Sequence, residues 1–287
     1  MFLLGLVIPL ISITGSLLVK TDTIERRPTD WRILGGGLAF GAVVTALGLL
    51  DVPHNQEITF VISLAVIGFM LTRVTAEISH ETRMKIFYAA LIIFFFRAMP
   101  SVGDGYRWFL IDQYGFDERF FGTLNVIGTA LTLIVAWFLS DAITRMRMTS
   151  VLIWLSVAGT ILALPSLLLV FHQGVAWTEA NLGMGAHSLA IIDTATTSPL
   201  VNLGMIPLLT LTAIYAPAGH RATWFALMSS FMNLALVAGE LGTKYMNHIF
   251  VVERGNYAAL PSLTVWVMLI GVVVPLSAIL LLRRKVD

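Results

Sequence analysis

Long apolar segments separated by short polar connections make up nearly the whole chain. Segments of about 18–25 apolar residues can cross the roughly 30 Å hydrocarbon core of a bilayer as helices, which satisfy their own backbone hydrogen bonds there. Such segments occur at about 2–19, 33–50, 58–72, 86–114, 120–140, 150–171, 184–216, 222–248 and 262–282. The pattern therefore predicts an all-α polytopic membrane protein with nine spans.

Two of the predicted spans are unusually long and contain prolines. Pro100 lies in the fourth span, and Pro199 and Pro207 lie in the seventh. Proline removes a backbone hydrogen bond and kinks or breaks a helix. In the fourth span, Gly103 and Gly105 weaken the helix further, so we expect unwound backbone that lines a cavity there.

The basic residues lie in alternate connections. They gather in the first, third and fifth connections and in the C-terminal tail, at Lys20, Arg26, Arg27, Arg32, Arg73, Arg83, Lys85, Arg145, Arg147, Arg283, Arg284 and Lys285. Connections two, four, six and eight carry almost none. Because Lys and Arg near span ends favour the cytoplasmic side, the C-terminus is predicted to be cytoplasmic.

The first span begins at Met1, directly within an apolar run. A basic n-region and a small-residue cleavage site, which mark a signal peptide, are not found there. An odd number of spans that starts in this way leads us to expect that the chain lacks an N-terminal portion. A native short form is the alternative.

Composition narrows the class of protein. Hydrophobic residues make up 57% of the 287 residues and charged residues only 12%, and mean hydropathy is +0.85. Soluble domains carry about 25% charged residues. These values exclude a soluble enzyme and a disordered protein, and a net charge of +1 excludes a nucleic-acid binder.

Motifs of enzymes and metal sites are not found. The chain has no cysteine, no HExxH sequence, no GxxxxGK[ST] loop and no histidine pair at metal-binding spacing. We therefore expect no cofactor, no metal and no enzymatic activity. A secondary transporter fits a chain of helices with a few buried charges.

Ionisable residues inside spans are the candidate functional groups, because each costs at least a few kcal/mol at the bilayer centre unless it is paired or faces water. The fourth span carries four, and we predict a substrate-binding role for Arg97, Asp104, Arg107 and Asp112. Helical spacing puts Arg97 and Asp104 on one face and Asp104 one turn from Arg107. An internal salt-bridge network that only holds the bundle together is the alternative.

The seventh and eighth spans add further candidates. Asp193 is a carboxyl in mid-span, one turn from Thr197, and we predict that it carries protons while Thr197 contacts substrate. On the eighth span, Asn233 is a predicted substrate contact and Glu240 a second proton carrier. A surface pair of Glu240 with Lys244 is the alternative for Glu240.

The turn before the eighth span holds one more charge. Arg221 lies there, on the predicted cytoplasmic side. We predict that it acts as a gating or anchoring charge.

Three stretches of the chain resemble sequence patterns of the folate-biopterin transporter family. Residues 96–105 read FRAMPSVGDG, residues 115–122 read GFDERFFG, and residues 216–234 read APAGHRATWFALMSSFMNL. They are similar to the family patterns FR-x-x-P-x-x-G-D, GF-x-x-x-F-x-G and P-x-G-x-x-[AG]-T-x-x-A-L-x-x-S-x-x-N-L. The details look most like the cyanobacterial and plastid branch.

The resemblance implies a major-facilitator fold, in which two six-helix halves surround a central cavity. Residues 86–287 would form the C-terminal six-helix half. Residues 1–85 would hold the last helix of the N-terminal half and a central helix pair with cytoplasmic linkers. The implied partners are the lipid bilayer and a missing N-terminal half. The implied location is a bacterial inner or plasma membrane or a plastid envelope.

The resemblance also implies uptake of folates or pterins by proton-coupled, alternating-access symport. The two carboxylates of a folate tail match the guanidinium groups of Arg97 and Arg107. The paired N–H donors of a pterin match the carboxylate of Asp104 or Asp193.

Two other functions stay open. The first is a major-facilitator carrier of another organic anion or a drug. The second is a non-transporting membrane fragment or scaffold. A membrane-embedded transferase is disfavoured, because the connections lack an acidic metal motif.

Overall fold

The computed structural model describes residues 7–18, 31–50, 52–76, 78–217 and 221–286. The chain divides into two compact units, Met1–Pro53 and His54–Asp287. The first unit contains helices α2 (Val7–Leu18) and α3 (Trp31–Leu49). The basic residues Lys20, Arg26 and Arg27 of the first connection lie outside the described residues.

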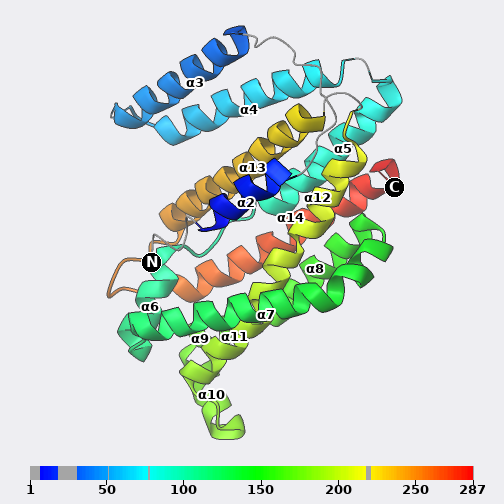
Figure 1. The fold of residues 1–287 in the computed structure, drawn as a ribbon. Helices are drawn as coiled ribbons and strands as arrows, with labels where there is room; N and C mark the ends of the chain where they lie inside the picture. The colour runs from blue at the N-terminus through cyan, green and yellow to red at the C-terminus, as the bar shows by residue number, and fades with distance from the viewer. Residues whose placement is uncertain (1–6, 19–30, 51, 77, 218–220, 287) are drawn as a thin grey trace. The chain divides into compact units, whose positions relative to one another are not determined.

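The second unit is a bundle of helices (Figure 1). In chain order they are α4 (Asn55–Val74), α5 (His80–Arg97), α6 (Asp104–Tyr114), α7 (Glu118–Arg145), α8 (Met148–Leu162), α9 (Leu164–Val170), α10 (His172–Leu182), α11 (Ala186–Leu203), α12 (Met205–Ile214), α13 (Arg221–Ile249) and α14 (Leu260–Val286). Helices occur at the positions of all nine predicted spans.

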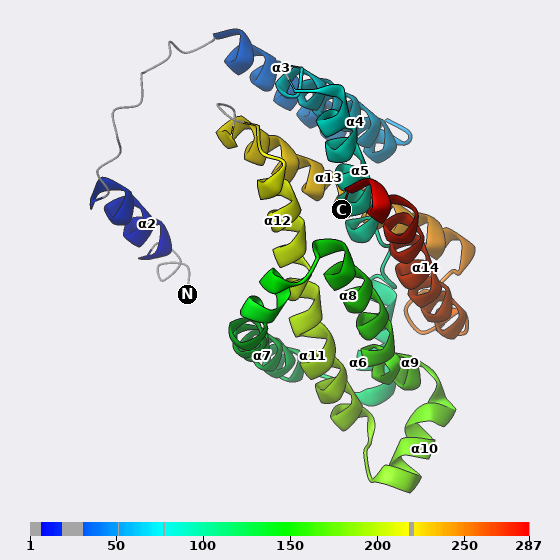
Figure 2. The same ribbon diagram turned by 90° about the vertical axis from the view of Figure 1, so that its right-hand side faces the viewer.

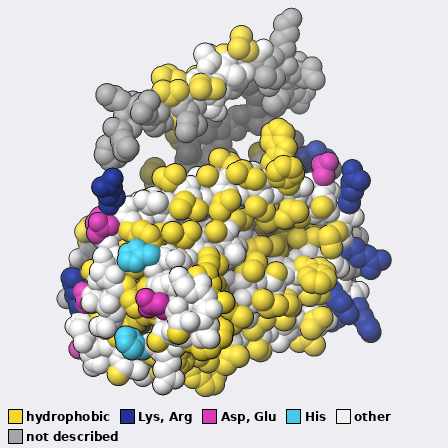
Figure 3. Space-filling view, turned by 90° about the horizontal axis from the view of Figure 1, so that it is seen from below, with side chains coloured by type: hydrophobic (Ala, Val, Ile, Leu, Met, Phe, Trp, Pro, Cys, Tyr) yellow, Lys and Arg dark blue, Asp and Glu magenta, His cyan; other side chains and the backbone are white. Residues whose placement is uncertain are grey.

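Six stretches of helix among the described residues are long and apolar enough to cross a membrane. They are Asn55–Val74, Glu118–Ile143, Met148–Val170, Ala186–Ile214, Arg221–Ile249 and Leu260–Val286. One face of the molecule shows a broad apolar surface, with Lys and Arg side chains at its edges (Figure 3). The protein is therefore an all-α, multi-pass membrane protein, as the sequence predicts.

The helices of the second unit pack in two groups. In one group, α5 and α4 pack against α13, and α14 packs against α5. In the other group, α11 packs against α7 and α9 (Figure 2). Contacts of α14 and α12 with α8 join the two groups. The helix at 55–74 thus belongs to the same compact unit as the helices that follow it.

Of three apolar cores among the described residues, the two largest stabilise opposite ends of the bundle. One surrounds Ile92, Trp224 and Ile279 near the start of α13 and the end of α14. The other surrounds Phe116 and Leu260 near the start of α7 and the start of α14. The side chains at the centres of both cores are almost completely inaccessible to water.

The fourth predicted span is broken, as its proline and glycines predict. Helix α5 ends at Arg97, residues 98–103 are not helical, and α6 begins at Asp104. Gly103 has a φ of 77°, a backbone conformation that side-chain-bearing residues rarely adopt. The break therefore follows directly from the local sequence.

Helix α10 was not expected, because the connection at 172–183 is too short and polar to read as a span. Val175 and Thr178 of α10 are buried, and the helix packs against α9. A helix of 11 residues needs only local hydrogen bonds and one packed face, which a hydropathy pattern does not register.

Candidate functional site

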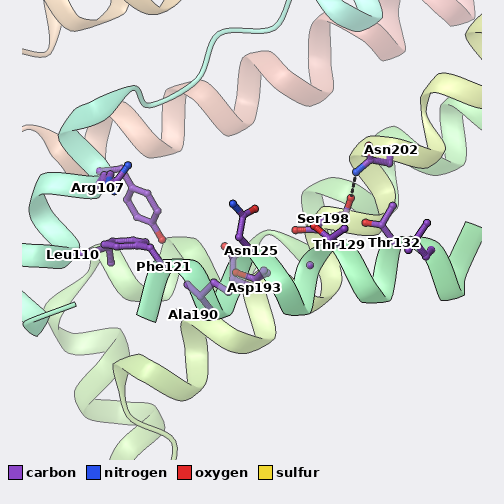
Figure 4. A pocket seen from close by; sticks show the side chains of 15 residues that line it. Arg107, Leu110, Phe121, Asn125, Thr129, Thr132, Ala190, Asp193, Ser198 and Asn202 are labelled. Carbon is purple, nitrogen blue, oxygen red and sulfur yellow. Dashed lines mark hydrogen bonds between the residues drawn. The ribbon is translucent and has the colours of Figure 1, made fainter. Parts of the chain in front are cut away.

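A polar cavity of about 590 Å³ lies among α6, α7 and α11 (Figure 4). Its volume falls in the range typical of small-molecule sites. The cavity is lined by Tyr106, Arg107, Leu110, Phe121, Leu124, Asn125, Gly128, Thr129, Thr132, Leu133, Ala190, Asp193, Thr194, Ser198 and Asn202. Asn125, Thr129 and Asn202 are exposed, so the cavity is an open groove; we call it the polar groove.

Helices α7 and α11 form the walls of the polar groove, and a glycine lets them approach closely. A Cβ atom on Gly128 of α7 would lie 2.7 Å from the Oγ of Ser198 and 3.2 Å from a methyl carbon of Thr194. Small residues at a helix crossing allow such close packing in membranes. The close approach places the polar side chains of both helices along one groove.

Asp193 is the acidic group of the polar groove. Its carboxyl lies between α11 and α9, where it interacts with Ser166. Its Oδ1 atom is buried and accepts no hydrogen bond from any residue that the structure describes, and the same holds for Oγ1 of Thr132. A buried polar oxygen without a hydrogen-bond partner is costly, so a hydrogen bond from a ligand or from water that enters the groove would stabilise these atoms.

Arg107 and Glu118 form an ion pair at one end of the polar groove. Nη2 of Arg107 donates to both carboxylate oxygens of Glu118, at 2.8 and 2.9 Å. The guanidinium also lies 4.9 Å from the centre of the Phe121 ring. Arg107 therefore pairs with Glu118 of α7 and not with Asp104, which helical spacing had suggested as its neighbour.

Arg97 lies at the end of α5, outside the polar groove. Its Nε donates to the backbone carbonyl of Met232 at 3.2 Å, and its Nη1 contacts the sulfur of Met205. Among the described residues it forms no ion pair with a carboxylate. The guanidinium is thus held between α12 and α13 with its charge unmatched.

Asp104 and Asp112 also lie outside the polar groove. Asp104 is the exposed first residue of α6. Asp112 accepts a hydrogen bond from the Tyr257 hydroxyl. Nη2 of Arg254 lies 3.5 Å from Oδ1 of Asp112. Burial and the bond to Asp112 raise the pKa of Tyr257, so its hydroxyl stays protonated as a donor. This cluster joins α6 to the connection between α13 and α14.

The other predicted site residues are dispersed. Thr197 donates to the backbone carbonyl of Asp193 at 2.7 Å within α11 and does not line the polar groove. Asn233 and Glu240 are exposed on α13, and Arg221 is its exposed first residue. Of the nine predicted residues, the structure brings only Arg107 and Asp193 together in the polar groove.

The alternative that Glu240 pairs with Lys244 is wrong. Nζ of Lys244 donates to Oε1 of Glu57 at 2.8 Å, and the hydroxyl of Tyr245 donates to the same oxygen at 2.8 Å. Glu57 lies in the first turn of α4. Lys244 therefore pairs with Glu57 on α4 and not with Glu240 on its own helix, because α4 packs against α13.

Several groove residues were missed in the sequence although a signal was present. Asn125, Thr129 and Thr132 recur every three or four residues on α7, in an otherwise apolar span. That spacing puts polar side chains on one helix face. On α11, the residues four apart that face the polar groove are Thr194, Ser198 and Asn202.

The chemistry of the polar groove suits a polar solute. It offers hydroxyl and amide groups, one carboxyl, one ion pair and aromatic rings, which together can orient a planar molecule. No group of three or more His, Asp or Glu side chains that could hold a metal ion occurs in the part of the chain that the structure describes.

Comparison with known proteins gives a consistent picture. The sequence model of the BT1 family matches residues 7–287. A protein named folate-biopterin transporter from Synechocystis sp. is 25% identical over 284 residues, which cover 87% of this chain and 56% of that protein. The chain thus spans a little more than half the length of this relative, whose name is that of a transporter and not of an enzyme. No solved structure matches the chain significantly. Since the family match covers almost the entire chain and agrees with the signature at residues 96–122, this protein belongs to the BT1 family.

Proposed function

We propose that this chain acts in secondary transport of folates or pterins across a membrane, coupled to protons by alternating access. The family and the name of the relative support a transporter of this substrate class. The substrate binds along the polar groove among α6, α7 and α11. Helices α5–α14 then serve as the C-terminal half of a major-facilitator fold, with the C-terminus on the cytoplasmic side.

The observation that carries this proposal is the carboxyl of Asp193. It faces a polar groove in an apolar bundle, its Oδ1 has no donor among the described residues, and no Lys or Arg of the described chain pairs with it. A carboxylate here accepts the paired N–H donors of a pterin ring. The same group can bind a proton from the water in the groove, which couples substrate and proton binding at one atom.

The remaining candidate residues have proposed supporting roles. Arg97 binds a carboxylate of the folate tail, because its charge is unmatched among the described residues. Arg107 orients substrate at the end of the polar groove. Further substrate contacts, a second proton carrier and a gate are proposed for Asp104, Asp112, Thr197, Asn233, Glu240 and Arg221.

The test is uptake of radiolabelled folate by proteoliposomes that contain this chain, with and without an inward proton gradient. We expect uptake that the gradient stimulates. In Asp193→Asn, which removes the charge and keeps the shape, we expect the stimulation to be lost. Glu179→Gln is the matched control, because Glu179 is an exposed carboxylate on α10 outside the polar groove.

Each other outcome contradicts part of the proposal. Stimulation that persists in Asp193→Asn rejects proton coupling at this residue. Competition by other organic anions or drugs but not by pterins indicates a carrier of different cargo. Uptake that is absent in every variant, with the chain correctly inserted, indicates a scaffold or fragment.

A further inference from the structure

A second cavity, of about 570 Å³, lies among α4, α5 and α13, away from the polar groove. It runs along α5 from Arg83 to Phe95, a rise of about 18 Å for a helix. That length is close to one leaflet of a bilayer, whose hydrocarbon core is roughly 30 Å thick. We call it the apolar groove.

The walls of the apolar groove are almost entirely hydrocarbon. They include Leu64, Leu71, Phe87, Phe94 and Phe231. The hydroxyl of Thr72, which also lines it, is already bonded to the backbone carbonyl of Phe69 at 2.7 Å. A folate or pterin would leave its many polar groups unsatisfied here, whereas an acyl chain would not.

Gly68 leaves open space on the α4 side of the apolar groove. It lines the apolar groove on α4, and a Cβ atom placed on it would have no atom within 4 Å. The space beside it is therefore open, and no helix of the described unit fills it.

All three helices bring an arginine to the same end of the apolar groove. Arg83 of α5 lines it, Arg73 of α4 directly follows the lining residue Thr72, and Arg221 lies one turn before the lining residue Trp224 on α13. The helix ends that carry them share one core cluster. Arg83 forms no ion pair with any residue of the described ranges.

We infer that the apolar groove is a binding site for an anionic phospholipid, with one acyl chain between α4, α5 and α13 and the phosphate at Arg83. An apolar slot of leaflet length matches the chain, and guanidinium groups match a phosphate. Basic pockets between membrane helices on the cytoplasmic side bind anionic headgroups. The arginines lie on the side that the charge pattern predicts to be cytoplasmic.

Trp224 provides a local reporter for this site. It lines the apolar groove, its side chain is only 1% exposed, and its Nε1 donates to the carbonyl of Thr212 at 2.8 Å. In a chain with Trp224 as its single tryptophan, a brominated acyl chain bound in the apolar groove quenches the fluorescence of this one residue. The other six positions are changed to Phe, at Trp31, Trp108, Trp137, Trp154, Trp177 and Trp266.

The experiment measures quenching of Trp224 by lipids with brominated acyl chains in detergent micelles. We expect phosphatidylglycerol to reach half-maximal quenching at a several-fold lower mole fraction than phosphatidylcholine. Arg83→Gln removes this difference, while Arg147→Gln, an exposed arginine outside the apolar groove, keeps it.

A variant that fills the apolar groove tests whether an acyl chain binds there. Gly68→Leu fills the apolar groove and should reduce quenching by both lipids. Gly159→Leu, at an equally open helical glycine of α8, should not. If Gly68→Leu does not fold, the comparison of Arg83→Gln with Arg147→Gln still tests whether the site selects the anionic headgroup.

Three results overturn the inference. Equal quenching by the two lipids means that no headgroup is selected. Unchanged quenching in a folded Gly68→Leu places the lipid elsewhere. No quenching by either lipid means that a further helix or a second copy of the chain covers the apolar groove.

Discussion

At the scale of single residues, glycines on α13 determine where the broken span can lie. The non-helical residues 98–103 pack on this helix, where the backbone N–H of Ser101 donates to Oγ1 of Thr243 at 2.8 Å. A Cβ atom on Gly239 would lie 2.6 Å from the carbonyl oxygen of Met99, whereas one on Gly242 would lie 3.4 Å from Cβ of Pro100. The first distance is a clash with backbone, and the second is an ordinary contact.

The two glycines should therefore respond differently to the same substitution. We expect Gly239→Ala to push the segment off α13 and to destabilise the protein by about 1–3 kcal/mol, as overpacking does. Gly242→Ala should be neutral or slightly stabilising, because alanine favours a helix by about 0.5–1 kcal/mol over glycine. Thermal unfolding in detergent measures both, and equal shifts would mean that the segment does not rest on Gly239.

At the scale of elements, one carboxylate ties α4 to the bundle. Glu57 accepts hydrogen bonds from Lys244 and Tyr245 of α13, and its side chain is 20% exposed. Glu81 and Lys85 form an ion pair of similar length, 3.0 Å, but within α5, and Glu81 is 81% exposed. Exposed pairs within a helix contribute little to stability.

Removing the charge of Glu57 should therefore have a larger effect than removing the charge of Glu81, because Glu57 joins two helices and Glu81 forms only a surface pair. In Glu57→Gln we expect amide hydrogen exchange in the first turns of α4 to become several-fold faster, because Lys244 and Tyr245 lose their shared anion. In Glu81→Gln, exchange in α5 should stay nearly the same. Hydrogen-exchange mass spectrometry tests this, and an unchanged α4 in Glu57→Gln would show that apolar packing alone holds it.

At the scale of the whole molecule, the positions of the spans determine which connections share a side of the membrane. One span, Met148–Val170, separates the α7–α8 turn from α10. The turn carries Arg145 and Arg147, whereas α10 has no Lys or Arg. We therefore predict that the turn and α10 lie on opposite sides of the membrane, with the turn in the cytoplasm.

The absence of cysteine in the sequence makes this prediction simple to check. Met146→Cys and Leu182→Cys each introduce one thiol at an exposed position. In intact cells, a membrane-impermeant maleimide should label Leu182→Cys and should label Met146→Cys only after permeabilisation. Labelling of both from one side would contradict the crossing at 148–170, and a reversed pattern would contradict the cytoplasmic C-terminus.

The sequence alone determined the long apolar helices, the class of protein and the break in the fourth span. These are local properties. Hydropathy over about 20 residues decides whether a segment can enter a bilayer, and Pro100 and Gly103 act on their own stretch of backbone. The ordered signature at 96–122 likewise predicted the family that the comparison confirmed.

Only the tertiary structure decided which charges meet and where the grooves lie. Lys244 bonds to Glu57, 187 residues away, and not to Glu240 four residues away. Thr129 and Ser198 reach the same groove because α7 and α11 pack closely at Gly128. A buried polar group takes whichever partner the packing of distant helices brings within about 3 Å, and the sequence around that group does not contain this information.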